Sequence, residues 1–169
     1  MDDQFIIKEL LGNRQVFNDL LSGLHHEQTT WRSAPEKWCL LEIICHLVDE
    51  EKEDFRARLK HVLETPGEPL PSIDPVGWVK ERKYMEQDYR EKLRSFLDER
   101  SKSVAWLESL ANPKWDHAYM HPKFGAMTAA MFLANWLAHD YLHFRQIIRL
   151  KFDYLKYSAA ETLTYAGTW

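Results

Sequence analysis

Hydrophobic residues recur with the period of an α-helix along four stretches of the chain, at spacings of three, four and seven residues. These stretches cover residues 3–25, 39–64, 80–110 and 128–152. Segments that contain proline and glycine separate them, and little of the sequence shows the strict alternation of a strand. The pattern therefore predicts an all-α fold, an antiparallel four-helix bundle.

The connection between the second and third stretches is rich in proline. Residues 65–78 hold four of the seven prolines and two of the six glycines. Proline has no backbone N–H and its ring clashes with the preceding turn, so no helix is expected to cross this segment. A bundle with one long crossover connection uses such a segment to run from one end to the other, and the segment is equally suited to cover a pocket as a lid.

Length and composition bound the class of protein. A chain of 169 residues suits one domain, residues 1–169, that buries roughly 70% of the surface its unfolded chain exposes. The net charge of -4 and pI near 6.1 give no basic field, so nucleic acid and anionic membranes are not expected partners. Cys39 and Cys45 form neither a metal-binding pair nor a disulfide framework. With no leader pattern and no membrane-spanning apolar stretch, we expect a soluble cytoplasmic protein.

The fourth stretch carries His139 and His143 a single helical turn apart. At 100° per residue the two imidazoles lie about 40° apart, so one ion can bind both. We expect them in the middle of an inward face, where a buried neutral imidazole needs a binding partner. That partner is either a metal ion or a neighbouring side chain of the core. That face is expected to contain Phe132, Asn135, His139, His143, Gln146 and Leu150. A metal site requires a third ligand.

The second stretch can supply that ligand through His46. Glu50 and Glu53 fall within about 40° of it on a helix, so an imidazole and a nearby acid share one stripe. The alternative for either acid is a solvated face, paired with a basic residue. His117 and His121 also lie four residues apart, but in a non-helical segment beside a proline. Outside a helix, this spacing does not bring two side chains together.

Two motifs carry a resemblance to a known family. EKWCLLEIICHLVDEE, residues 36–51, is similar to the stretch around the first metal histidine of the DinB-like (YfiT-type) proteins, and HDYLHFRQI, residues 139–147, is similar to their H-x-x-x-H-x-x-Q stretch. The order of the helices and the Pro-rich connection extend the resemblance over nearly the whole length. Cys39, where many relatives have serine, and Phe144-Arg145, where they commonly have Arg-Gly, depart from the family pattern outside the ligand positions.

The resemblance implies a divalent metal ion, zinc or nickel, held by His46, His139 and His143. Three protein ligands leave a coordination position open, which is typical of a catalytic site. The family includes thiol-dependent S-transferases, a maleylpyruvate isomerase and metal-dependent hydrolases. It therefore implies a metal-dependent transferase or hydrolase acting on a small molecule, with a low-molecular-weight thiol as one candidate, and a homodimer.

The residues around the predicted ligands suggest roles in such a reaction. We expect Glu50 to act as hydrogen-bond acceptor for a ligand or as general base. Gln146, one turn beyond His143, is placed either to orient a ligand imidazole or to bond two helices. Phe132, Trp136 and Tyr141 are expected in the core or in the pocket wall.

Two readings without catalysis compete with this one. In the first, the protein is a binding or stress-response module whose metal only ties two helices together. In the second, it is a metal-free bundle whose histidines form a polar network in the core. A fourth strong ligand would favour the first, and the sequence shows only acids and loop histidines of ambiguous role.

Overall fold

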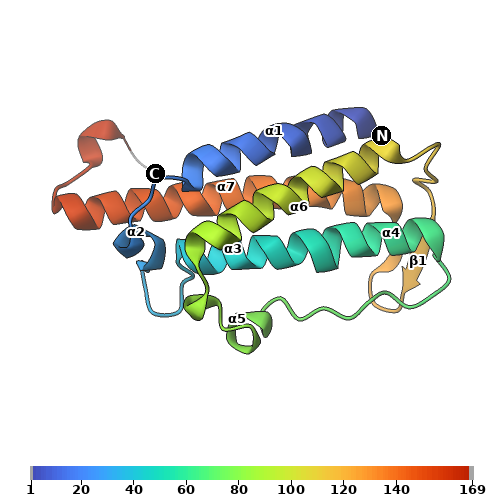
Figure 1. The fold of residues 1–169 in the computed structure, drawn as a ribbon, viewed down its shortest axis with the longest axis horizontal. Helices are drawn as coiled ribbons and strands as arrows, with labels where there is room; N and C mark the ends of the chain where they lie inside the picture. The colour runs from blue at the N-terminus through green and yellow to red at the C-terminus, as the bar shows by residue number, and fades with distance from the viewer. Residues whose placement is uncertain (1, 168–169) are drawn as a thin grey trace.

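The computed structural model describes residues 2–167, and long helices lie side by side in it as an elongated bundle (Figure 1). A continuous helical segment, α3 (Leu40–Asp49), η1 (Glu50–Arg56) and α4 (Ala57–Glu64), forms one side. The other long helices are α1 (Asp3–Leu21), α6 (Tyr89–Ser109) and α7 (Ala129–Ala159). The predicted helical bundle is therefore confirmed.

The helices do not all run antiparallel to their neighbours. Asn13 contacts Asp140 and the Leu20 carbonyl accepts from Lys151, so α1 and α7 run in the same direction. The segment α3–α4 and α6 share the opposite direction (Figure 1). Antiparallel packing thus holds for α1 with α6 and for α4 with α7, while the other neighbours are parallel. Because α4 and α6 run in the same direction, the chain between them returns along the bundle.

That returning chain shortens the third predicted helix. Residues 65–77 lie in no helix or strand, and the short helices α5 (Trp78–Glu81) and η2 (Tyr84–Glu86) follow. Lys83 between them adopts a left-handed conformation with φ of 48°, which an α-helix cannot contain. The helix predicted from residue 80 therefore begins only at Tyr89, where the Asp88 side chain caps it by accepting from the Glu91 N–H.

The second predicted helix is continuous but not uniform. Its middle, η1, is π-helical over seven residues. Each π turn is wider than an α turn, because its hydrogen bonds close onto the fifth preceding residue. Side chains after Asp49 therefore face directions that a regular α-helix does not predict.

A hairpin that the sequence pattern did not predict precedes α7. Strands β1 (Ala118–His121) and β2 (Gly125–Thr128) pair antiparallel, with His121 opposite Gly125. Gly125 has a φ of 72°, a value that glycine adopts without strain. Thr128 then caps α7 by accepting from the Met131 N–H, as the sequence predicts. The helix extends beyond the predicted end at residue 152.

Smaller helices complete the fold. The first predicted stretch ends at Leu21, and the short helix α2 (His26–Thr30) follows as a separate element. η3 (Thr164–Ala166) lies near the C-terminus. Among the described residues, no helix is long and apolar enough to cross a membrane.

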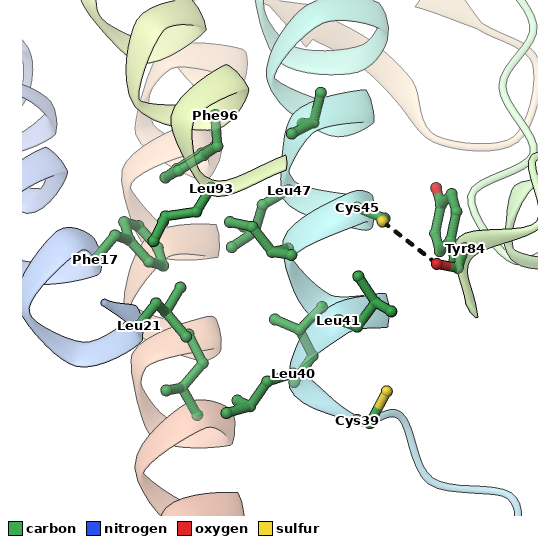
Figure 2. Close-up of a cluster of buried hydrophobic side chains, with 14 of the residues drawn as sticks. Phe17, Leu21, Cys39, Leu40, Leu41, Cys45, Leu47, Tyr84, Leu93 and Phe96 are labelled. Atoms are coloured by element: carbon green, nitrogen blue, oxygen red, sulfur yellow. Dashed lines mark hydrogen bonds between the residues drawn. The ribbon is translucent and has the colours of Figure 1, made fainter. Parts of the chain in front are cut away.

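Two groups of buried apolar side chains hold the helices together. One joins α1, α3, α6 and α7, and Figure 2 shows Phe17, Leu21, Leu47 and Phe96 within it. The other joins α1, α4, α6 and α7, and includes Leu10, Leu59 and Leu133. Each fully buried leucine or phenylalanine contributes roughly 1.5–3 kcal/mol through removal of apolar surface from water. Buried polar residues lie between and beside these groups.

Candidate metal centre

Three histidine side chains converge between α3 and α7. His46 projects from α3, and His139 and His143 project from successive turns of α7. One ring nitrogen from each lies within 4.8 Å of the others. The Nε2 atoms of His139 and His143 are 3.0 Å apart, and the His46 ring centroid is 5.1 Å from that of His143. The three imidazoles of the sequence prediction therefore do meet.

Aromatic rings flank the cluster on two sides. The Trp38 ring centroid lies 4.9 Å from that of His46. Phe55, from η1, lies 4.9 Å from His139 by the same measure. Apolar rings reduce the access of water to the imidazoles, which favours their neutral form.

The imidazoles are held neutral by their surroundings. Burial lowers the pKa of His46 to about 3 and that of His139 to about 2, and a neighbouring histidine acts in the same direction in both cases. Burial also lowers the pKa of His143, while Gln146 and Asp140 act in the opposite direction. Each ring therefore carries a nitrogen lone pair at neutral pH.

Lone pairs in this arrangement fit a cation. Two Nε2 lone pairs 3.0 Å apart repel each other unless a proton or a cation lies between them. The buried Nδ1 atom of His46 has no hydrogen-bond partner among the described residues. Neutral imidazoles are common ligands of divalent transition metals. The donor set thus suits a divalent ion on chemical grounds.

We expected the histidines in the middle of the buried face of α7. They lie at its edge instead. Asn135 is exposed and His139 is partly exposed. The centre of the buried face is formed by Trp136, Asp140 and Ile147. From the sequence we centred the inward face of this helix on the two histidines. The buried face of α7 is instead centred on the residues one position away, such as Asp140. This displacement leaves the cluster accessible from one side.

Glu50 lies behind His46, at the start of the π-helical turn. Its Oε1 atom is 4.0 Å from His46 Nδ1, too far for a hydrogen bond, and has no donor among residues 2–167. Burial raises the pKa of Glu50 to about 8, and the Asp54 carboxylate adds to the effect. The side chain is therefore mainly a neutral carboxyl at pH 7 in the absence of a nearby cation.

Glu53 does not join the cluster. Its carboxylate binds the Arg82 guanidinium at 2.7 and 2.9 Å on the surface. The π-helical turn rotates the following residues, so that Asp54 and Phe55 face α7 instead. Of the two alternatives considered for Glu53, the solvated face paired with a basic residue is therefore the observed one.

The two loop histidines have partners elsewhere. The Nδ1 atom of His117 lies 3.1 Å from the Leu63 carbonyl oxygen. His121 Nδ1 accepts from the backbone N–H groups of Lys123 and Phe124 in the hairpin. Neither belongs to the group of potential ligands formed by His46, His139 and His143.

An open pocket of about 420 Å³ adjoins His139, between η1–α4 and α7. Its wall is mainly apolar and includes Phe132, as considered from the sequence. Trp136 instead lies beneath, fully buried, and Tyr141 is exposed and donates to Glu9. The lining residues are Asp54, Phe55, Arg58, Phe124, Met127, Met131, Phe132, Asn135, Ala138, His139 and Leu142. A small molecule in this pocket would lie against one face of the histidine cluster.

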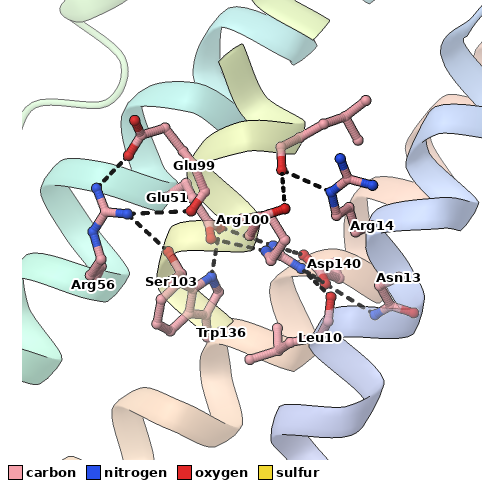
Figure 3. A network of polar contacts seen from close by, with 12 residues as sticks. Leu10, Asn13, Arg14, Glu51, Arg56, Glu99, Arg100, Ser103, Trp136 and Asp140 are labelled. Atoms are coloured by element: carbon pink, nitrogen blue, oxygen red, sulfur yellow. Dashed lines mark hydrogen bonds and ion pairs between the residues drawn. The ribbon is translucent and has the colours of Figure 1, made fainter. Parts of the chain in front are cut away.

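A second buried polar group, which we call the arginine cluster, was not predicted (Figure 3). Arg100 donates two hydrogen bonds each to Glu51 and Asp140 and one to the Leu10 carbonyl. Asp140 also accepts from Asn13, and Glu51 from Trp136. The arginine cluster comprises Arg100, Glu51, Asp140, Trp136 and Asn13. The sequence held a signal, because Arg100 lies on the apolar stripe Leu93, Leu97, Val104 and Leu107.

Comparisons with known proteins found a matching family profile and a similar solved structure. The DinB superfamily profile matches residues 9–147. A solved structure described as "YfiT from Bacillus subtilis is a probable metal-dependent hydrolase with an unusual four-helix bundle topology" superposes with a TM-score of 0.77. The two sequences are 17% identical, and the match covers 88% of this chain and 85% of the other. At this identity the likeness establishes the shared fold. No curated protein matches the sequence.

Proposed function

The chain belongs to the DinB superfamily, and we propose that it is a metal-dependent hydrolase whose divalent ion, zinc or nickel, is held by His46, His139 and His143. The observation that carries the proposal is the convergence of three neutral imidazoles, with two Nε2 atoms 3.0 Å apart, beside an open pocket. A structural relative that is itself described as a probable metal-dependent hydrolase supports the same class of reaction.

A divalent ion held by these three imidazoles would supply Lewis acidity, which activates water or a thiol near neutral pH. The chain's own residues have other tasks. Trp38 and Phe55 restrict water around the imidazoles, since their rings pack on His46 and His139. The pocket beside His139 orients the substrate.

Glu50 is the residue we propose to move a proton. A cation within a few ångströms favours the carboxylate form, so metal binding opposes the effect of burial on this side chain. As a carboxylate its Oε1 atom can accept a proton from the attacking nucleophile, and it lies on the histidine side of η1, 4.0 Å from His46 Nδ1. We expect Glu50→Gln to retain the metal and to lose most turnover.

Thiol S-transfer is the second candidate reaction. It is favoured by the presence of depressions on both sides of the histidines, one beside His139 and one beside His143. Two reactants could occupy them. The homodimer and the cytoplasmic location stay predictions from the sequence.

Elemental analysis of the purified, untagged protein tests the proposal. We expect about one equivalent of zinc or nickel in the wild type and none in the His139→Ala/His143→Ala variant. A metal in the wild type justifies assays of amide and ester hydrolysis beside thiol conjugation. The absence of metal from both proteins, even after incubation with zinc or nickel, would contradict the proposal and favour the metal-free bundle.

A further inference from the structure

The depression beside His139 is one part of a longer groove along α7. Leu142 lines both that pocket and the depression beside His143. Gln146 and Arg149 in turn line both the latter depression and a third one that contains Trp38. The three depressions therefore adjoin one another in a row along α7, with His139 in the first and His143 in the second. We call this row the groove.

We propose that this groove binds substrates with an apolar acyl group at one end and carboxylates at the other, as in an N-acylated amino acid. The bond to be cleaved would then lie over the histidines. The inference rests on the proposed hydrolase function and adds the class of substrate. In the reaction, the oxygen of water bonds to the acyl carbon, the C–N bond breaks, and the nitrogen receives a proton from that water.

The end beside His139 suits the acyl group. Phe132 and Met131 line it from α7, and Phe124 and Met127 from the hairpin. The charges of Asp54 and Arg58 in this wall neutralise each other, because the two side chains form an ion pair at 3.5 Å. The Asn135 amide is engaged by its own helix through the Met131 carbonyl. An apolar group gains free energy here from leaving water, whereas an unpaired charge does not.

The other end suits carboxylates. Three basic residues, Lys37, Arg145 and Arg149, line the two depressions there, against a single acid, Asp153. Arg149 pairs with Asp153 at 3.0 Å. Among residues 2–167, Lys37 and Arg145 form no ion pair with an acid, and both are exposed. The excess of positive charge attracts an anion.

Aromatic rings join both ends to the histidines. Phe55 lines the apolar end and packs on His139, and Trp38 lines the basic end and packs on His46. A ligand that occupies both ends must therefore cross the cluster. This placement distinguishes the groove from two unrelated surface hollows.

Isothermal calorimetry tests the substrate class with three probes: N-octanoylglutamate, octanamide, which lacks the carboxylates, and N-acetylglutamate, which lacks the long acyl chain. Binding is measured on both metal-free and zinc-loaded protein, because the two ends belong to the chain and do not need the ion. We expect N-octanoylglutamate to bind at least about tenfold more tightly than either fragment, about 1.4 kcal/mol.

Variants assign the two ends. Lys37→Glu/Arg145→Glu should weaken N-octanoylglutamate binding by about tenfold or more without changing the affinity for octanamide. Leu142→Asp, at an exposed position, should weaken both octanoyl ligands. Lys8→Glu on the exposed face of α1 is a single charge reversal away from the groove and should change neither affinity.

The outcomes separate this inference from the proposed function. Equal affinities for the three probes, or no binding of N-octanoylglutamate, overturn the substrate class even if the protein holds one equivalent of metal. Absence of metal, with the probe preference intact, overturns the hydrolase and leaves the groove's ligand class standing.

Discussion

Two polar clusters lie next to each other along α7, and they differ in how many of their polar atoms have partners. The histidine cluster lies between α3 and α7, whereas the arginine cluster joins α7 to α1, η1 and α6. In the arginine cluster the donors of Arg100 are taken up by Glu51, Asp140 and a backbone carbonyl (Figure 3). In the histidine cluster, two Nε2 atoms face each other and His46 Nδ1 has no partner among the described residues.

This difference suits the arginine cluster to a structural role and the histidine cluster to the proposed binding of a metal ion. Burial alone would lower the pKa of Arg100, but the two carboxylates raise it above its usual range, so the charge is retained. The histidines instead lose their charge to burial and keep free lone pairs. A buried polar cluster whose hydrogen-bonding atoms are all paired within the protein stabilises the fold. A cluster with unpaired atoms needs a bound ligand to pair them.

Removal of Arg100 should produce the largest effect. Arg100→Met leaves Glu51 and Asp140 buried without a counter-charge, and loss of one partner of a buried pair costs about 3–5 kcal/mol. We expect the free energy of unfolding, measured by urea denaturation, to fall by this amount. Lys102→Met, at an exposed position of the same helix, should change it by less than about 0.5 kcal/mol. A loss below about 1 kcal/mol for Arg100→Met would show that the arginine cluster is not what holds these helices.

The histidine cluster should respond to metal where the arginine cluster does not. Zinc at 100 times its Kd stabilises the native state by about 2.7 kcal/mol, which raises the Tm of a domain of this size by roughly 5–10 °C. Differential scanning calorimetry with and without zinc measures the shift. It should vanish in His143→Ala and persist in His26→Ala, whose side chain lies on the surface. An equal shift in His143→Ala would indicate binding elsewhere.

The sequence predicted the long helices well because apolar spacing reports burial directly. It predicted their boundaries less well where local chemistry prevails. The helix expected from residue 80 begins at Tyr89, although Asp88 followed by Glu91 is a recognisable capping pattern. The π-helical turn over Glu50–Arg56 has no comparable signal, since its charged residues suit an α-helix equally.

The convergence of the three histidines was predictable from the sequence, but the surroundings of the candidate site were not. His139 and His143 follow from their spacing, and His46 follows from its stripe together with the family motif. For Glu53 the sequence left two alternatives open, the stripe of His46 and a solvated face, and the solvated face is the observed one, because one widened turn changes the phase of every later residue. The contact of Arg100 with Asp140 depends on how separate helices pack, which the periodicity of a single helix does not contain.

Trp136 contacts both clusters, so its substitution tests whether the arginine cluster affects metal binding by the histidine cluster. Its Nε1–H donates to Glu51, and its ring stacks on Phe55, which packs on His139. Trp136→Phe removes the hydrogen bond but retains an aromatic ring, so we expect a loss of about 1–2 kcal/mol in urea denaturation. Metal content by elemental analysis should stay unchanged. Loss of metal in this variant would mean that the arginine cluster positions the ligands.

The smallest effect should come from a partly buried ion pair beside the arginine cluster, where Arg56 binds Glu99 (Figure 3). Burial acts to raise the pKa of Glu99, but hydrogen bonds from Lys102 and Arg56 lower it below its ordinary value of 4.5. The folded state therefore favours the carboxylate. This stabilisation is complete above the unfolded pKa and is lost as the pH falls through the lower, folded pKa.

Arg56→Gln should consequently destabilise the protein by less than about 1 kcal/mol at pH 7, as expected for a solvent-screened pair. The difference from the wild type should shrink below pH 4.5 as Glu99 becomes protonated. Urea denaturation of both proteins at pH 7, 5 and 3 measures it. A difference that persists undiminished at pH 3 would assign the contribution of Arg56 to its hydrogen bonds with Ser103 and the Glu99 carbonyl, which do not depend on a charged partner.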